Sequence, residues 1–257
     1  MATLHTIAVA GKGGVGKTTT CGMIIDYLCA KKQGPVLVID ADANSNLNEV
    51  LGVEVETSLG EIREEMARAE LRGDTIPTGM TKADYAEFKF NSALIEEDDF
   101  DMLVMGRTQG KGCYCYVNGV LQTQIEKYAK NYRYMVMDNE AGLEHVARGT
   151  LPHVDTMLLI SDCSRRGIQA AARVAEMIEE MALKPGKLGL IVNRAPGGVL
   201  DAGVREEIEK HGLTLFGVLP HDEGVYRCDC NGEPSAKLPE NNPVKAALHS
   251  IMQSLGL

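Results

Sequence analysis

The chain has 257 residues, of which 44 % are hydrophobic and 5 % aromatic, with no Trp, so it can build a large, mainly aliphatic core. Its formal net charge of −10 disfavours non-specific binding to nucleic acid or anionic lipid. It has no apolar run of about 20 residues and no signal-peptide pattern at its start, which together predict a cytoplasmic protein with neither membrane nor nucleic-acid partners.

Short apolar runs alternate with helical segments along the chain. Most runs are continuous rather than alternating, which is typical of parallel strands buried on both faces. The expected strands are Thr6–Ala10, Val36–Asp40, Met102–Gly106, Tyr134–Asp138, Thr156–Ser161, Leu188–Asn193 and Thr214–Leu219. The clearest expected helices are Thr19–Lys31, Arg166–Met181, Ala202–Lys210 and Val244–Ser254.

This order of elements predicts an α/β fold. We expect a doubly wound, mainly parallel sheet of about seven or eight strands flanked by helices. Residues 1–257 are expected to form a single domain, with a charged helical insertion on the surface around residues 58–100 that contains no convincing strand.

A glycine-rich motif follows the first expected strand. Gly11-Lys-Gly-Gly-Val-Gly-Lys17-Thr18 fits the G-x-x-x-x-G-K-[ST] pattern of a P-loop, and it opens the first expected helix. Glycines let several backbone N–H groups turn toward phosphate oxygens, and the helix adds its positive N-terminal end. Lys17 is expected to reach the β- and γ-phosphates, and the Thr18 hydroxyl to bind Mg²⁺.

The motif therefore predicts the P-loop NTPase fold and a Mg²⁺-dependent ATP hydrolase. The residues expected to bind ATP or ADP here are Gly11, Gly13, Gly14, Val15, Gly16, Lys17, Thr18 and Thr19.

Polar residues end several of the expected strands, where the carboxyl edge of a parallel sheet faces the ligand crevice. Asp138 is predicted to hold Mg²⁺ through water at a Walker B position, and the alternative is an ordinary turn residue. Asn193, with Arg194 directly after it, is predicted to contact the adenine base, because an Asn amide offers both a donor and an acceptor. Pro220 follows the next strand and resembles the base-lining loop of one class of P-loop ATPases, which implies that it lines the base as well. A strand-ending Asn is also common in turns.

Lys12, the second lysine of the loop, completes the pattern G-K-G-G-V-G-K-T-T. This pattern resembles the deviant Walker A loop of the MinD/ParA/nitrogenase-iron-protein class of ATPases. The resemblance implies a homodimer in which Lys12 reaches the phosphates bound by the partner subunit, whereas the alternative is a solvated surface charge. It also implies that Asp42 of Asp40-Ala-Asp42 positions the attacking water. The class usually has Pro next, whereas Ala43 stands here, which is expected to loosen the loop.

The same resemblance extends to the segment Asp138-Asn-Glu-Ala-Gly142. It is similar to the D-x-x-A-G switch, in which the N–H of Gly142 would sense the γ-phosphate.

Two Cys-x-Cys pairs, Cys113-Tyr-Cys115 and Cys228-Asp-Cys230, hold four of the seven cysteines. In a reducing compartment we expect no disulfide framework. In an extended segment, residues two apart project to the same side, so both sulfurs can bind one soft metal ion. A second pair from a symmetry-related subunit would complete an S₄ site for Ni²⁺ or Zn²⁺.

Cys113 and Cys115 are therefore predicted to bind metal across a dimer, and the alternative is two idle cysteines. For Cys228 and Cys230 two readings stay open: an auxiliary metal relay with His221 or His211, or incidental thiols.

The Cys113-Tyr-Cys115 segment and the run Ala141-Gly-Leu-Glu-His145 together resemble the CooC/AcsF family of nickel-insertion ATPases, and the likeness covers nearly the whole chain. The resemblance implies a homodimer that uses ATP to insert nickel into its client, a carbon monoxide dehydrogenase or an acetyl-CoA synthase.

Two alternatives remain. One is an iron–sulfur cluster carrier or nitrogenase-iron-protein-like ATPase, although the tight Cys pair speaks against it. The other is a MinD/ParA-like positioning ATPase on membrane or DNA. The net charge, and a segment 241–257 with Lys245 as its one strong base, speak against that reading.

Overall fold

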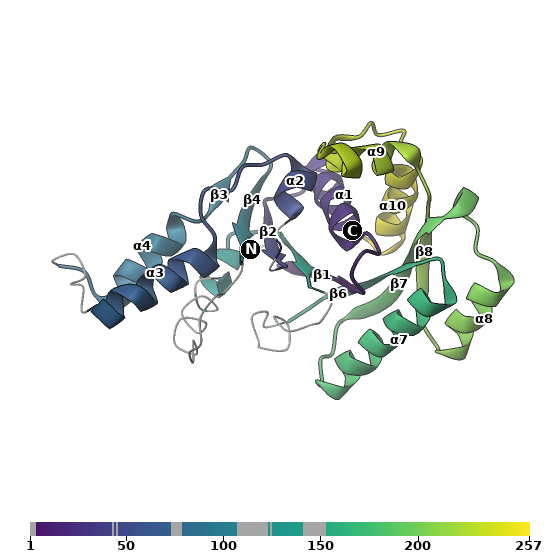
Figure 1. The fold of residues 1–257 in the computed structure, drawn as a ribbon, viewed down its shortest axis with the longest axis horizontal. Coiled ribbons are helices and arrows are strands. Elements are labelled where there is room, and N and C mark those ends of the chain that lie inside the picture. The colour runs from purple at the N-terminus through teal and green to yellow at the C-terminus, as the bar shows by residue number, and fades with distance from the viewer. Residues whose placement is uncertain are drawn as a thin grey trace.

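A single eight-stranded sheet forms the centre of the molecule (Figure 1). The computed structural model describes residues 4–42, 44, 46–72, 79–106, 123, 125–140 and 153–257. The strand order is β3-β4-β2-β5-β1-β6-β7-β8, and all neighbours are parallel except β3 and β4. The strands are β1 (His5–Gly11), β2 (Val36–Ala41), β3 (Ile95–Glu96), β4 (Phe100–Val104), β5 (Tyr134–Asn139), β6 (Thr156–Asp162), β7 (Lys187–Ala195) and β8 (Leu215–Pro220).

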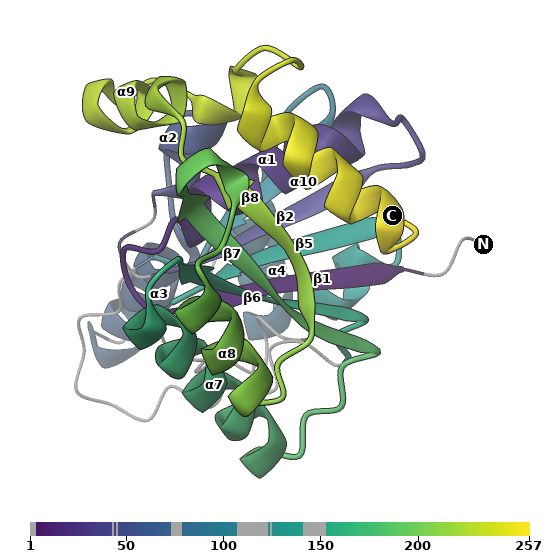
Figure 2. The ribbon, with the colours of Figure 1, turned by 90° about the vertical axis from the view of Figure 1, so that its right-hand side faces the viewer.

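Helices cover both faces of this sheet. They are α1 (Lys17–Ala30), α2 (Leu47–Leu51), α3 (Leu59–Arg72), α4 (Lys82–Asn91), α7 (Arg165–Glu180), α8 (Ala202–Lys210), α9 (Glu223–Asn231) and α10 (Pro243–Ser254), with 3-10 turns η1 (Pro196–Gly198) and η2 (Ser235–Lys237). Figure 2 shows α1 and α10 on one face and α7 and α8 on the other. In the described parts of the chain, every helix is too short or too polar to cross a lipid bilayer.

Two apolar cores result from this arrangement, one on each face of the sheet. Successive strand residues point to opposite faces, so Ile7 and Val9 pack with α1 and α10, whereas Ala8 and Ala10 pack with α7. The central strands are buried throughout, which explains their continuous apolar runs. The predicted doubly wound, mainly parallel sheet with flanking helices is confirmed.

The strand order places a ligand crevice beside β1. The chain passes from β1 to β2 on one side, and β6 then follows β5 on the opposite side of β1. In such open sheets the crevice lies where this direction reverses, outside the carboxyl ends of the strands. Asp40 of β2 and Asp138 of β5 are direct partners in the register, so both acidic residues reach this edge together.

Some element boundaries differ from those expected. β4 begins at Phe100 and ends at Val104, two residues earlier than the predicted strand Met102–Gly106. Residues 58–100 contain not only α3 and α4 but also the strand β3, which pairs antiparallel with β4 through two residues. A two-residue strand is too short to show any periodicity in the sequence. The helix α9 was not expected either.

Candidate functional site

The P-loop connects β1 to α1 as the sequence predicted. Gly14 and Gly16 have φ angles of 79° and 89°, and Gly16 is the residue at which α1 is capped. A Cβ on Gly16 would lie 2.4 Å from Nδ2 of Asn193, so this position combines a left-handed backbone with a close contact that only glycine tolerates. Lys17 is buried, and its Nζ donates to the carbonyl oxygen of Lys12 at 3.4 Å.

Asp138 is a buried carboxylate at the end of β5. Within the part of the chain that the structure describes, neither of its carboxylate oxygens accepts a hydrogen bond at bonding geometry. Burial raises the pKa of Asp138 to about 7, although the nearby Thr18 hydroxyl and Lys17 charge favour the ionised form. A carboxylate in this state is costly unless a cation balances it.

Asp40, at the paired position on β2, is equally buried but has partners. Its two carboxylate oxygens accept the backbone N–H groups of Asp42 at 3.1 Å and Leu47 at 3.2 Å, so it fixes the turn that leads into α2. Burial raises the pKa of Asp40 to about 6, because these two hydrogen bonds only partly offset the desolvation.

The donor set at Asp138 fits Mg²⁺. This hard cation prefers oxygen ligands, and an unpartnered buried carboxylate beside the Thr18 hydroxyl supplies them. Asp138 and Thr18 are therefore the residues that would hold the metal.

The deviant Walker A resemblance implies roles for two residues, Asp42, which follows β2, and Lys12, which lies in the loop itself. Asp42 is half-buried after β2, and its carboxylate accepts the N–H of Asn44 at 2.8 Å. Lys12 is exposed and lines a hollow of about 550 Å³ with Arg166 and Arg173 of α7.

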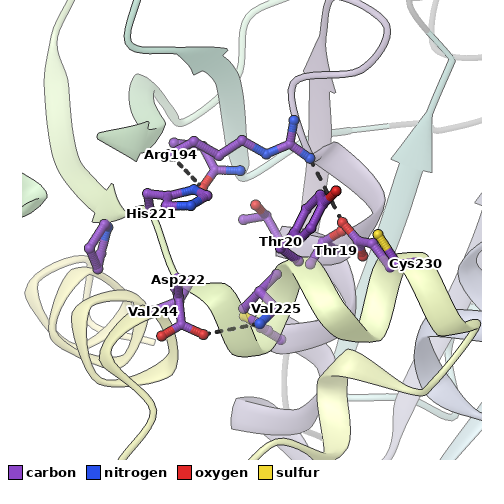
Figure 3. A pocket seen from close by; sticks show the side chains of 13 residues that line it. Thr19, Thr20, Arg194, His221, Asp222, Val225, Cys230 and Val244 are labelled. Carbon is purple, nitrogen blue, oxygen red and sulfur yellow. Dashed lines mark hydrogen bonds and ion pairs between the residues drawn. The ribbon is translucent and has the colours of Figure 1, made fainter. Parts of the chain in front are cut away.

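A cavity of about 400 Å³ lies beside the P-loop, between α1, the ends of β7 and β8, and α9. Four residues predicted to contact nucleotide line it: Thr19, Asn193, Arg194 and Pro220. Figure 3 shows Arg194 reaching across it toward α9, with Thr19, Thr20 and Cys230 close by. The structure thus brings the predicted base-lining residues together at one wall.

The α9 wall of this cavity was missed by sequence reasoning. It contributes Val225, Tyr226, Asp229 and Cys230. The sequence signal for this helix is Asp222, since Asp is a preferred N-cap residue. In the structure the Asp222 carboxylate caps α9 by accepting the Val225 N–H at 3.0 Å.

The side-chain amide of Asn193 forms hydrogen bonds with the backbone of the P-loop and of the next residue. Its Nδ2 donates to the carbonyl oxygen of Val15 at 3.0 Å, and its Oδ1 accepts the N–H of Arg194 at 2.8 Å. Asn139, which follows Asp138, acts similarly on β1 by donating from Nδ2 to the carbonyl oxygen of Val9 at 3.0 Å. The adenine-reading role of Asn193 stays a prediction.

The structure bears on the second Cys-x-Cys pair, for which an auxiliary metal relay and incidental thiols were both left open. Cys228 and Cys230 lie on α9 rather than in an extended segment, so their side chains are separated by about 200° around the helix axis. Cys228 is buried and Cys230 is exposed, and the two thiols do not form the shared soft-metal pair considered for them.

The first Cys-x-Cys pair and the switch glycine, Cys113, Cys115 and Gly142, lie outside the described residues. Among the residues that are described, no group of three or more His, Cys, Asp and Glu side chains is placed to hold a metal ion.

Comparison with known proteins places these features in a family. The family described as the CobQ/CobB/MinD/ParA nucleotide binding domain matches residues 6–235. An uncharacterised ATP-binding protein of Methanocaldococcus jannaschii is 42 % identical over 249 residues, covering 97 % of each chain. The carbon monoxide dehydrogenase accessory protein CooC of Rhodospirillum rubrum is 28 % identical, covering 97 % of this chain and 95 % of its own.

A solved structure agrees with the fold. The septum site-determining protein MinD of Pyrococcus horikoshii, complexed with Mg-ADP, superposes with a TM-score of 0.68 at 18 % identity, covering 98 % of this chain and 96 % of its own. The chain belongs to the CobQ/CobB/MinD/ParA family of nucleotide-binding domains.

Proposed function

We propose that this chain is a Mg²⁺-dependent ATPase that acts as a homodimer and inserts nickel into a carbon monoxide dehydrogenase or an acetyl-CoA synthase. The observation that carries the catalytic part is the combination of an intact P-loop with Asp138, a buried carboxylate without a hydrogen-bond donor among the described residues. Membership of a nucleotide-binding family supports the same part.

Each residue of the site has a separate role in ATP hydrolysis. The P-loop N–H groups and Lys17 bind the phosphates of ATP, and Asp42 orients the attacking water. Mg²⁺ held by Thr18 and Asp138 supplies positive charge to the phosphates when bound. The N–H of Gly142 senses the γ-phosphate. Hydrolysis removes this contact and so shifts the dimer from one conformational state to the other.

Lys12 is proposed to complete the site of the partner subunit. Its side chain is exposed beside α7, which leaves it accessible to a second copy. Lys12→Ala is expected to keep ADP binding but to lower ATP hydrolysis about a hundredfold and to prevent ATP-dependent dimerisation, because it removes a charge at the transferred phosphate. Phosphate release and light scattering measure the two effects, with the exposed Lys130→Ala as the matched control. Unchanged hydrolysis and dimerisation in Lys12→Ala would show that it stays a solvated charge.

The nickel function is supported by the Cys113-Tyr-Cys115 spacing and by the likeness to CooC. Anaerobic titration of the apoprotein with Ni²⁺ is expected to bind one ion per two chains and to produce thiolate-to-nickel charge-transfer bands. Cys113→Ser and Cys115→Ser are each expected to abolish these bands, whereas Cys230→Ser, an exposed cysteine outside the pair, retains them.

Other outcomes of this titration separate the alternatives. A brown protein with visible absorption would favour the iron–sulfur carrier, and intact ATP hydrolysis without any stoichiometric metal would leave an ATPase with another cargo. The positioning alternative has less support, because Leu248 and Met252 of α10 are buried in the core and unavailable to lipid. Pelleting with liposomes or salt-sensitive DNA binding would restore it.

A further inference from the structure

Two carbonyl groups of the P-loop are bound by side chains from the end of β7. Nη1 of Arg194 donates to the carbonyl oxygen of Gly14 at 3.0 Å, and Nδ2 of Asn193 donates to that of Val15 at 3.0 Å. Both donors therefore approach the loop from the β7 side and draw these carbonyl groups toward it.

The orientation of a carbonyl group fixes the next N–H group. A peptide is planar, and in its trans form the C=O and N–H of one unit point in opposite directions. The described residues contain no cis peptide bond. The bond to the Gly14 carbonyl therefore turns the N–H of Val15 away from β7, and the bond to the Val15 carbonyl does the same for Gly16. These are N–H groups that a P-loop presents to phosphate.

Arg194 is itself held in an unusual conformation. Its φ of 57° lies in the left-handed region, which is uncommon for a residue with a side chain and is retained where surrounding contacts impose it. One such contact is the Cys163 thiol, which donates to the Arg194 carbonyl oxygen at 3.4 Å.

The guanidinium of Arg194 also has a partner on α9. Its Nη2 lies 3.8 Å from Oδ2 of Asp229. Burial raises the pKa of Asp229, while the Arg194 charge and a hydrogen bond from the Thr19 side chain favour its ionised form. Arg194 thus links the P-loop, the end of β7 and α9.

We propose that Arg194 is a positioning residue for phosphate binding: its guanidinium, braced by Asp229, holds the Gly14–Val15 peptide so that the Val15 N–H faces the β-phosphate. This role rests on the proposed nucleotide function and differs from the base contact that the sequence predicted for Arg194.

A comparison of ADP with AMP separates the two roles. AMP keeps the base, the ribose and the first phosphate but lacks the β-phosphate. In Arg194→Ala the dissociation constant for ADP, measured by calorimetry, is expected to rise about tenfold, because a hydrogen bond from a charged donor is lost. The constant for AMP is expected to change by less than about twofold.

Companion variants make the result independent of folding defects. Arg194→Gly adopts a φ of 57° without strain, so it should fold and show the same selective loss for ADP. Arg194→Lys keeps the charge and should restore part of the ADP affinity. Arg227→Ala removes an exposed arginine of α9 and is expected to change neither constant. Thermal unfolding of each variant confirms its fold.

Equal losses for ADP and AMP in the Arg194 variants would overturn the positioning role and support a base contact. An unchanged ADP affinity in Arg194→Gly would overturn it as well. If the wild-type protein binds neither nucleotide, the proposed ATPase function fails, and this is seen before any variant is compared.

Discussion

Asp138→Asn is expected to lower ATP hydrolysis about a hundredfold or more while making the nucleotide-free protein more stable. The variant removes the carboxylate that would hold Mg²⁺ behind the phosphates. It also removes a buried charge whose two oxygens accept no hydrogen bond at bonding geometry from the described residues, although the Thr18 hydroxyl is nearby. Function and stability therefore change in opposite directions at one residue, as is typical where a site is built to receive a cation.

The gain in stability should depend on pH. The pKa of Asp138 is about 7 in the folded protein against an ordinary value of 3.8 for aspartate, so folding takes up a proton between these two values. The free energy of unfolding of the wild type therefore falls as pH rises through this window and stays low above it. This difference corresponds to at most about 4 kcal/mol, which Asp138→Asn would recover at pH 8 but not at pH 4.5.

Denaturant unfolding without nucleotide or Mg²⁺, at pH 4.5 and pH 8, measures this difference. Asp40→Asn is the matched control, because Asp40 is equally buried but accepts two backbone N–H groups that an amide cannot fully satisfy. The pKa of Asp40 is raised less, to about 6, and the amide leaves one of these N–H groups without an acceptor, so Asp40→Asn is expected to gain less stability at pH 8 than Asp138→Asn. If Asp138→Asn were destabilising at pH 8 or hydrolysed ATP normally, the assignment of Asp138 as a cation-binding carboxylate would be wrong.

Lys245→Met is expected to destabilise the fold by about 3 kcal/mol, the largest effect on stability that we predict away from the nucleotide site. The side chain of Lys245 is 2 % exposed, and its Nζ lies 2.6 Å from Oδ2 of Asp26 and 2.8 Å from Oε1 of Glu240. It also donates to the carbonyl oxygens of Ala236 at 3.2 Å and Leu238 at 3.0 Å. One ammonium group therefore joins α1, η2 and α10.

Burial opposes the charge on Lys245, but the pairs with Asp26 and Glu240 outweigh it and raise the pKa of the ammonium group. Methionine fills a similar volume yet leaves the Asp26 carboxylate without its ion-pair partner and two carbonyl groups without a donor. The expected loss of stability is smaller than the largest values for breaking a buried ion pair, because the Asp26 side chain is 30 % exposed and water can reach it.

Thermal and urea unfolding measure the effect, and a fall in melting temperature of about 8 °C is expected. The control is Lys184→Met, an exposed lysine between α7 and β7, which should change stability by less than about 0.5 kcal/mol. Equal stability of the two variants would show that the Lys245 cluster contributes nothing net to the fold.

Much of the fold was predictable because its signals are local. Buried parallel strands are continuous apolar runs, and the P-loop motif follows one of them at a fixed spacing, so β1 and α1 were placed correctly from the residues alone. The position of Asp138 at a strand end was visible for the same reason. The antiparallel β3 was not, because a pairing of two residues depends on its neighbour β4 rather than on its own sequence.

The glycine-rich loop of the candidate site was predictable from the sequence, whereas the cavity beside it was predictable only in part. Asn193, Arg194 and Pro220 were recognised as strand-end residues and do line the cavity beside the P-loop. The carbonyl groups to which the Asn193 and Arg194 side chains donate, those of Val15 and Gly14, lie roughly 180 residues away, and no local pattern encodes such a pairing.

The sequence by itself determined the alternation of strands and helices, the P-loop and the acidic residue behind it, since each depends on neighbouring residues and on backbone preferences. Only the tertiary structure decided three other features. The β7 side chains hold the P-loop carbonyl groups, and Asp40 and Asp138 are partners across β2 and β5. Cys228 and Cys230 diverge around α9. The physical reason is that hydrogen-bond partners, strand register and side-chain direction are set by packing between segments distant in the chain, which spacing along the sequence does not specify.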